Sequence, residues 1–369
     1  MPSPFDRNAE GRSPAPWPSP PGNRDIEALR PARNQLDPDI PYHFLHEQEP
    51  GPAGMETVNT IFLTGKECSF KCLMCDLWKN TLEGPTPPGA IVRQLDYALA
   101  RLPAARSIKL YNNGNFFDPK AVPLSDHAAI LERVEYAHRV IVENHPLLVG
   151  DACLRFRDGL TGTLEIAMGL ETIHPTALPA LNKQLTPEVF RRATGFLKTN
   201  GIRVRAFVLL NPPYLTNPAV GSPGLRAQAV VHEGIRSALE TVRFAFESGV
   251  DCCSIIATRP GNGIMETLLA AGQYIPPTLA ALEEVFAEAL LLARSSGGST
   301  SASGSTGAPG SSVHSPGAPQ RLVFVDTWDI GFLSSCPHCF AARKERLEKM
   351  NLLQTNLEPI TCSCHSEHV

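Results

Sequence analysis

Three features that would classify this 369-residue sequence at once are missing. No apolar run approaches the length of a membrane span, so we expect no transmembrane helix. The N-terminus lacks the charged-then-apolar pattern of a targeting segment, and we therefore expect a cytoplasmic protein. The formal net charge is -4, so any binding of nucleic acid has to come from a local basic patch.

Cysteine, in contrast, is well represented, with ten residues. In a chain without a secretory pattern, clustered thiols serve metals rather than disulfides. The hydrophobic content of 43% is enough for one domain of barrel size and an accessory segment. The composition therefore indicates an enzyme-sized core in a reducing compartment.

Two segments have the composition of unstructured chain. Residues 1–52 hold 12 of the 34 prolines and little periodic apolar character, which predicts disorder, although the aromatics of 39–49 could dock on a folded body. Residues 295–320 are nearly all Ser, Gly, Thr, Ala and Pro and read as a flexible linker. The folded parts are then a main domain over 53–294 and a C-terminal extension over 321–369.

The main domain alternates short β-branched runs with helical patterns, which is typical of repeated βα units and a parallel sheet. Thr186-Pro187 and Asn200-Gly201 mark the start and end of one helix. The sequence predicts an α/β fold, a partial (βα)6 TIM-type barrel. Its six strands are expected near 59–64, 107–111, 139–143, 164–168, 204–210 and 253–258.

The most informative motif is a C-x3-C-x2-C run directly after the first of these strands, formed by Cys68, Cys72 and Cys75. Three thiolates on one loop can hold three irons of a [4Fe-4S] cube and leave the fourth iron free for a small molecule. The alternatives are a zinc site, which usually takes four protein ligands, and reduced thiols in the core.

This run resembles the cysteine motif of the radical S-adenosylmethionine (radical SAM) enzymes. The resemblance implies that the open iron binds S-adenosylmethionine and that an electron from the cluster gives a 5'-deoxyadenosyl radical. It also implies a reductant such as flavodoxin or ferredoxin. The residue before the third cysteine is usually aromatic in this family and packs near the adenine, and Met74 takes that place here.

Active sites of parallel βα barrels form at the carboxyl ends of the strands. Asn113, Gly114 and Asn115 follow the second strand, where the family has a Gly-Gly-Glu-like motif that meets the cofactor's amino group. The alternative is a plain Asn-Gly turn. The third strand ends in Glu143 and, two residues on, His145. Burying a carboxylate and an imidazole is costly, which favours a functional role and makes Glu143 a predicted cofactor contact. The alternative is a glutamate that caps a neighbouring loop.

Two further strand ends carry candidate cofactor contacts. Glu171 and Thr172 lie in a Gly-Leu-Glu-Thr turn similar to one in the radical SAM branch that contains the catalytic subunit of Elongator, where it meets the cofactor's ribose and methionine portions. Arg259 precedes a Gly-rich turn after the sixth strand and could meet a carboxylate or phosphate. An ordinary loop would explain the same run.

The remaining cysteines fall into two groups. Cys336 and Cys339, with Cys362 and Cys364, could supply four thiolates to zinc or a second iron-sulfur cluster, or could be two unrelated reduced pairs. Cys153 and the adjacent Cys252 and Cys253 are predicted to be packing thiols, the last two on opposite faces of a strand.

Taken together, the motifs resemble the radical SAM subunit of archaeosine synthase and its bacterial relatives. The resemblance implies a reaction of lyase or transferase type, with radical C–N bond cleavage on a modified nucleoside of transfer RNA, and a separate enzyme that prepares the substrate. Two other hypotheses stay open. One is a radical SAM enzyme that modifies a peptide or small metabolite, and the other is a non-catalytic iron-sulfur or redox-sensing protein.

Overall fold

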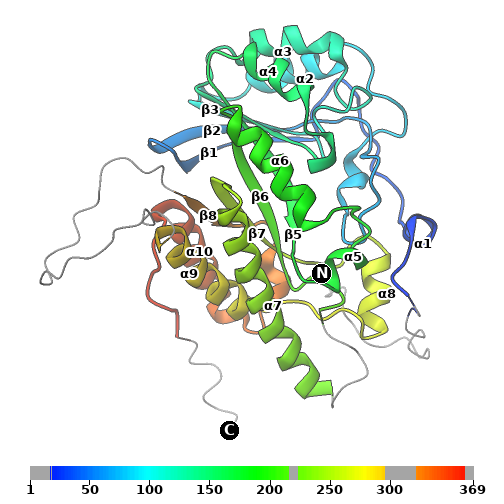
Figure 1. Cartoon of the computed structure of the whole chain (residues 1–369), viewed down its shortest axis with the longest axis vertical. Helices are drawn as coiled ribbons and strands as arrows, with labels where there is room; N and C mark the ends of the chain where they lie inside the picture. Colours follow the sequence, from blue (N-terminus) through cyan, green and yellow to red (C-terminus); the bar gives the residue numbers. More distant parts are fainter. Residues whose placement is uncertain (1–16, 18, 216–222, 296–320, 362–369) are drawn as a thin grey trace, which may run out of the picture.

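A computed structural model describes residues 17, 19–215, 223–295 and 321–361 (Figure 1). Its central feature is an eight-stranded sheet in the order β1 to β8, in which β1 runs antiparallel to β2 and all later neighbours are parallel. The strands are β1 His43–Gly51, β2 Gly54–Phe62, β3 Ser107–Tyr111, β4 Arg139–Glu143, β5 Thr163–Glu171, β6 Arg203–Leu210, β7 Cys252–Ala257 and β8 Leu322–Val325.

Helices follow most of the strands, as in a βα barrel. The α-helices are α1 Asn23–Ala28, α2 Ala90–Leu99, α3 His127–Val134, α4 Asp151–Asp158, α5 Ala177–Ala180, α6 Pro187–Thr199, α7 Pro223–Glu247, α8 Ile264–Ala270, α9 Leu279–Ser295 and α10 Pro337–Leu353. Short 3-10 turns are η1 Leu77–Asn80, η2 Leu124–Asp126, η3 Pro146–Leu148 and η4 Ile330–Leu333. None of the helices within the described ranges has both the length and the apolar character needed to cross a membrane.

The sheet curls until its distant strands face each other. Arg205 of β6 reaches Glu49 of β1 at 2.6 Å, a contact that a flat sheet in this strand order could not make. No pairing joins β8 to β1 within the described part of the chain, and α10 contacts both of these edge strands. The predicted partial barrel is therefore confirmed, and the six predicted strands correspond to β2 to β7.

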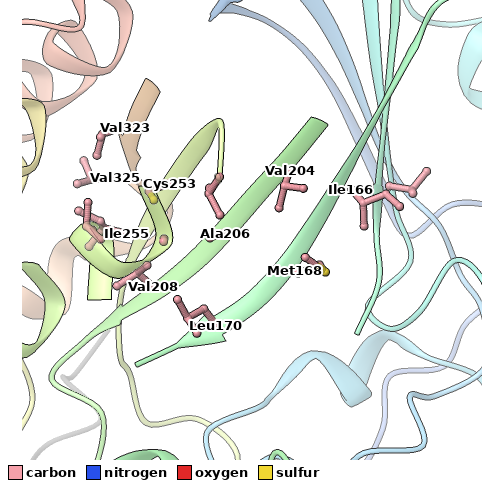
Figure 2. Close-up of a cluster of buried hydrophobic side chains, with 14 of the residues drawn as sticks. Ile166, Met168, Leu170, Val204, Ala206, Val208, Cys253, Ile255, Val323 and Val325 are labelled. Carbon is pink, nitrogen blue, oxygen red and sulfur yellow. The ribbon is translucent and has the colours of Figure 1, made fainter. Parts of the chain in front are cut away.

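The two faces of the sheet have different chemistry, because successive side chains of a strand point to opposite sides. The outer face is apolar and packs under the helices (Figure 2); it includes Ile166, Met168, Val204, Ala206, Val208, Cys253, Ile255, Val323 and Val325. Cys153 belongs to the same core, whereas Cys252 packs with Leu322 and Phe324. The prediction of packing thiols on opposite faces is confirmed.

The N-terminal prediction needs a correction. Within residues 1–52, the structure places α1 and the nine-residue strand β1, which pairs with β2 from His43↔Phe62 to Gly51↔Gly54. The segment carries few signals of its own, and the backbone hydrogen bonds to β2 supply its order. Helix α6 follows its predicted caps, with the Thr186 hydroxyl accepting from Val189 N at 3.3 Å and Gly201 in the left-handed region with φ 71°.

The C-terminal part is not an appendage, since β8 pairs in parallel with β7 from Cys252↔Leu322 to Ile255↔Val325. Residues 321–353 therefore complete the same sheet and its helical cover. The predicted linker, except residue 295 at the end of α9, lies outside the described residues.

Candidate active site

The cysteine loop, residues 65–76 between β2 and η1, lies at the carboxyl ends of the strands, which we call the mouth of the barrel. Asn182, in the segment after β5, donates from its amide to the Lys71 carbonyl at 2.8 Å. Asn262, in the segment after β7, donates to the carbonyls of Leu73 at 2.8 Å and Cys75 at 3.1 Å. Segments that follow two different strands therefore fix the loop across the mouth.

An apolar cluster holds the loop from its other side. Met74 is half-buried and packs against this cluster, which joins α1, the loop and α8 through Ile26, Leu73, Ile264, Met265, Leu268 and Tyr274. In Figure 1, α1 and α8 lie beside each other next to the mouth. The structure thus gives Met74 a packing role, and its predicted contact with a cofactor stays a prediction.

The thiols of Cys68, Cys72 and Cys75 influence each other electrostatically, because charge on one raises the pKa of its neighbours. Burial is the largest cause of the raised pKa of each thiol, and it brings the pKa of Cys72 to about 11. The Lys183 ammonium opposes this shift at Cys68 and Cys72. The buried lysine therefore favours the thiolate form, which is the form that binds iron.

The donor chemistry of the loop fits a [4Fe-4S] cluster. Each thiolate of such a cube binds a different iron, so its protein ligands do not have to converge on one point. Among the residues described, no three His, Cys, Asp or Glu side chains are placed to hold a single metal ion. Three soft thiolates spread over one loop match the cube's requirement for three irons bound by protein and one left open.

Asn115 connects the loop after β3 to both the cysteine loop and the end of β4. Its amide nitrogen donates to Cys68 Sγ at 3.2 Å, and its amide oxygen accepts from His145 N at 2.7 Å. Gly114 lies at the same contact, since a Cβ built there would lie 3.6 Å from Cys68 atoms. The structure therefore brings the predicted residues Gly114 and Asn115 directly to a predicted cluster ligand.

His145 is held as a neutral packing residue. Its Nδ1 accepts from Leu147 N at 3.2 Å, which leaves the proton on Nε2, facing the Lys183 carbonyl at 3.2 Å. Burial and the nearby Lys183 charge lower the pKa of His145 to about 3. The ring stacks on Phe70 of the cysteine loop, with centroids 3.8 Å apart. These contacts give the histidine a role in holding the cysteine loop.

Glu143 holds the backbone of the loop after β3. Its Oε2 accepts from the backbone N–H groups of Asn112 and Asn113 at 3.0 and 3.1 Å. Burial raises the pKa of Glu143 to about 7, although these N–H groups and that of Gly114 act in the opposite direction. The observed contacts make Glu143 a positioning residue for the loop.

Asn113 has its side chain committed to protein partners. Its amide oxygen accepts from the Tyr42 hydroxyl at 3.0 Å, and its amide nitrogen donates to the Asn80 carbonyl at 3.3 Å. With φ 53°, the residue adopts the left-handed conformation that asparagine tolerates better than most residues. Any contact of Asn113 with a ligand would therefore use its backbone.

Glu171 lies in a bulge at the end of β5 and pairs with a residue that the sequence analysis missed. Its Oε1 lies 2.9 Å from Lys183 Nζ, and both side chains are buried. The carboxylate and the nearby thiolates outweigh desolvation and raise the pKa of Lys183, so this lysine stays charged. No local periodicity singles out Lys183; two left-handed neighbours, Asn182 and Gln184, turn it toward the cysteine loop.

Thr172 points elsewhere. Its hydroxyl lies 3.0 Å from the Ser237 hydroxyl of α7 and accepts from His174 N at 3.0 Å. These contacts place Thr172 under a helix on the outer side of the sheet. Its predicted role as a cofactor contact receives no support from the observed geometry.

Arg259 stands at the rim of the mouth, between the ends of β7 and β8. Its Nε lies 3.9 Å from Asp76 Oδ2, a long ion pair, and its charge acts on Asp326, which follows β8. Asp76 directly follows the third loop cysteine, so the predicted residue Arg259 does lie beside the cysteine loop.

Several polar side chains at the mouth are buried without a hydrogen-bond partner among the described residues. Both amide atoms of Asn112 and Asn211, the amide oxygen of Asn144 and the hydroxyl of Thr258 are in this state. They follow β3, β6, β4 and β7, respectively. Burying a polar group without a partner is costly, so these groups mark places where a ligand or water completes the structure.

The second predicted metal site is only half within the described residues. Cys336 caps α10 and Cys339 lies in its first turn, where its sulfur is 3.9 Å from the Cys336 carbonyl oxygen. Cys362 and Cys364 lie outside the described residues, so a second metal site at these four cysteines stays a prediction.

Two relatives can be aligned with the chain, while no protein-family model matches it. An uncharacterized protein of Methanocaldococcus jannaschii is 24% identical over 327 residues, covering 83% of this chain and 79% of that protein. Subunit beta of archaeosine synthase from Methanosarcina acetivorans is 25% identical over 228 residues, covering 59% of this chain and 61% of the subunit. The second match agrees with the resemblance seen in the motifs.

Similar solved structures include radical SAM proteins. SuiB of Streptococcus suis, solved with S-adenosylmethionine bound, matches with a TM-score of 0.40 and 13% identity over 60% of this chain and 44% of SuiB. Coproporphyrinogen III oxidase of Escherichia coli, a radical SAM enzyme, matches with a TM-score of 0.38 and 14% identity over 63% of this chain and 51% of the oxidase.

Proposed function

We propose that this protein is a radical SAM enzyme. The observation that carries the proposal is the cysteine loop, which places Cys68, Cys72 and Cys75 across the mouth of a parallel βα barrel. The enzymes of parallel barrels work at this edge. When bound there, a [4Fe-4S] cluster with S-adenosylmethionine supplies reductive cleavage of the sulfonium to a 5'-deoxyadenosyl radical, with one electron from a reductant such as flavodoxin or ferredoxin.

The chain's own residues prepare the site. The three cysteines would hold the cluster, with Lys183 favouring their thiolate forms and Asn115 donating its N–H to Cys68 Sγ. Glu143 holds the backbone after β3 beside them. The half-buried Gly114 and the rim residue Arg259 offer polar contacts that an amino acid-like cofactor needs.

For the substrate, we propose a modified nucleoside in RNA, with radical C–N bond cleavage of the archaeosine synthase type. The motifs and the match to the archaeosine synthase subunit support this choice. The chain spans 61% of that subunit's length. A separate enzyme that prepares the nucleoside is part of the same proposal.

The test is 5'-deoxyadenosine formation by the anaerobically reconstituted protein with dithionite and S-adenosylmethionine, with and without bulk transfer RNA of the host. We expect product formation that the RNA increases several-fold. The Cys72→Ala variant should lose turnover completely, because the cluster loses a ligand. The matched control is Cys153→Ala, which removes a buried thiol from the core instead of the loop.

Each result has a definite meaning. Turnover in Cys72→Ala equal to that of Cys153→Ala would contradict the radical SAM proposal. Wild-type turnover that ignores the RNA would retain the radical chemistry and contradict the RNA substrate. Circular dichroism of both variants separates loss of the cluster from loss of the fold.

A further inference from the structure

A continuous row of aromatic rings crosses the mouth of the barrel, and the site described above does not use it. The row begins outside, with Trp328 after β8, and passes over β1, β2 and β3 to β6 on the far wall. The centroid distances are 5.6 Å for Trp328–His43, 5.8 Å for His43–Phe62, 6.1 Å for Phe62–Tyr111 and 6.3 Å for Tyr111–Phe207.

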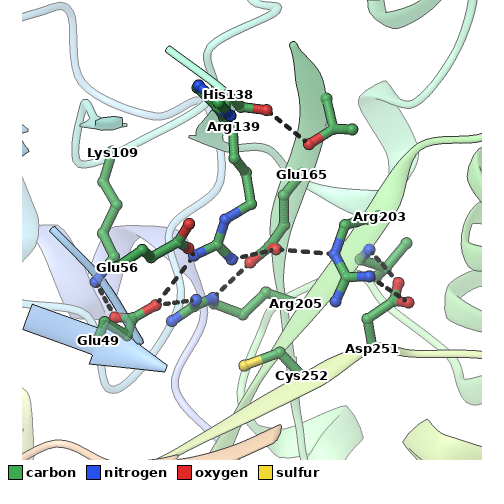
Figure 3. A network of polar contacts seen from close by, with 12 residues as sticks. Glu49, Glu56, Lys109, His138, Arg139, Glu165, Arg203, Arg205, Asp251 and Cys252 are labelled. Carbon is green, nitrogen blue, oxygen red and sulfur yellow. Dashed lines mark hydrogen bonds and ion pairs between the residues drawn. The ribbon is translucent and has the colours of Figure 1, made fainter. Parts of the chain in front are cut away.

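The inner end of the row lies inside the barrel. Tyr111 ends β3 and Phe207 belongs to β6, and these strands are separated by β4 and β5 in the sheet. Their rings can meet only across the barrel interior. Lys109 and Arg205 belong to the charged network in Figure 3 and lie on the same two strands, each two residues before the ring on its strand. The rings therefore lie one layer closer to the mouth than this network.

None of the rings of the row is fully buried. Trp328 is 62% exposed, His43 is exposed, and Phe62, Tyr111 and Phe207 are half-buried. Neighbouring rings are tilted or edge-on to each other, with interplanar angles from 35° to 83°, so no ring of the row is stacked face to face on the next. A ring without a stacked neighbour is suited to stacking with a flat ligand.

The row joins the cysteine loop through Tyr42. The ring of Tyr42 lies 5.5 Å from that of Phe62, and its hydroxyl donates to Asn113, next to the glycine that contacts Cys68. A planar group moving inward along the row would thus arrive beside the predicted cluster ligands. The row also carries two polar groups, the imidazole of His43 and the hydroxyl of Tyr111. The Tyr111 hydroxyl makes no hydrogen bond to the other described residues.

From this arrangement we infer that the row Trp328–His43–Phe62–Tyr111–Phe207 is the entry and binding path for the planar base of a nucleoside substrate. The inference rests on the proposed function, in which the reacting group belongs to a nucleoside. Rings alone would suit any flat group, and the imidazole and phenol beside them suit the hydrogen-bonding edge of a base better than a phenylalanine side chain.

The experiment measures binding of guanosine to the reconstituted full-length protein by equilibrium dialysis, with ribose and N-acetylphenylalanine amide as competitors. Wild type should bind guanosine, with little competition from either compound. Trp328→Ala and Phe62→Leu should each weaken binding at least about fivefold, the usual loss when one stacking ring is removed. Tyr136→Ala is the matched control, because Tyr136 is 46% exposed and precedes β4 at the opposite end of the barrel.

Equal binding by wild type and Trp328→Ala, or no binding at all, would overturn the inference. So would competition by N-acetylphenylalanine amide as strong as that of guanosine, which would assign the row to a peptide. The unfolding midpoint of Phe62→Leu shows whether its loss is specific. Dialysis needs no S-adenosylmethionine cleavage, so a failure of the radical chemistry and a failure of this inference are distinguishable.

Discussion

The two ends of the barrel bury polar groups of different kinds. At the amino end, buried charges form a network of ion pairs (Figure 3). Glu165 lies 2.8 Å from both Arg139 and Arg205, and Arg205 also meets Glu49, which pairs with Lys109. At the mouth, buried amides and a hydroxyl lack partners among the described residues.

This difference separates stability from function. The paired charges join β1 to strands on the far side of the barrel. Arg139 Nε and Arg203 Nη2 have no partner among the described residues, but the other nitrogens of both guanidinium groups are ion-paired. The unpaired groups at the mouth cost stability, and such a cost persists where binding requires it. We therefore expect substitutions at the amino end to change unfolding, and substitutions at the mouth to change activity.

The largest effect is expected at the amino end, from Glu165→Gln. Burial raises the pKa of Glu165, but the nearby Arg205 and Arg139 lower this pKa by more than burial raises it. The carboxylate is therefore charged and balances two buried guanidinium groups. Its loss should lower the free energy of unfolding by about 3–5 kcal/mol. Urea denaturation measures the change.

The control for this variant is Glu345→Gln, on the exposed face of α10, which should leave the unfolding midpoint nearly unchanged, because an exposed ion pair contributes little to stability. Equal effects of the two substitutions would remove the distinction between the ends of the barrel.

The second effect concerns pH. The pKa of Glu143 is about 7 when folded and near 4.5 when unfolded, so the folded state holds more protons between these values. Its contribution to stability therefore falls as pH rises from about 4.5 to about 7, by up to about 3 kcal/mol, and stays low above pH 7. Relative to Glu143→Gln, wild type should lose stability across this window.

Urea denaturation at several pH values tests this expectation, with Glu132→Gln, an exposed glutamate, as the control. A difference between wild type and Glu143→Gln that is independent of pH from 4.5 to 7 would show that Glu143 does not titrate there.

A third, smaller effect compares two buried threonines. Thr258 has an unpaired hydroxyl at the mouth, whereas the Thr241 hydroxyl donates to the Ser237 carbonyl at 2.6 Å and accepts from Ile173 N at 3.1 Å. Thr258→Val should raise the free energy of unfolding by about 1 kcal/mol, and Thr241→Val should lower it by about 1 kcal/mol. Thr258→Val should also reduce 5'-deoxyadenosine formation. A loss of stability in Thr258→Val with unchanged turnover would assign this threonine to the scaffold.

The finest test concerns Asn115 and needs a spectroscopic measurement. Donation of an N–H to a thiolate ligand makes a cluster easier to reduce, so Asn115→Leu should shift its reduction potential to a more negative value. A redox titration followed by electron paramagnetic resonance measures this potential. The control is Asn59→Leu, a buried asparagine whose amide contacts His46 Nδ1 and the Pro103 carbonyl and no thiol. Equal potentials for the two variants would show that the bond to Cys68 is not maintained in the loaded protein.

Much of the architecture follows from local patterns. The β-branched runs predicted β2 to β7, and the Thr186-Pro187 pair predicted the start of α6, because these signals lie within a few neighbouring residues. Strand β1 was missed, since its order depends on pairing with β2 rather than on a periodicity of its own. The place of β8 in the same sheet likewise depends on its pairing with β7.

The candidate site likewise combines residues that the sequence identified with one that only the folded structure identifies. The spacing of Cys68, Cys72 and Cys75 identified the central motif, and strand-end positions led to Gly114, Asn115 and Arg259, which do lie beside it. Lys183 gave no sequence signal, because a single lysine in a turn is ordinary until folding buries it against Glu171.

By itself, the sequence determined the alternation of strands and helices and the three-cysteine loop, because periodicity and spacing are properties of adjacent residues. Only the tertiary structure decided the partners of that loop, the network of ion pairs and the aromatic row from Trp328 to Phe207. These features join residues that are far apart in the chain, and their contacts exist only when the curled sheet brings its distant strands face to face.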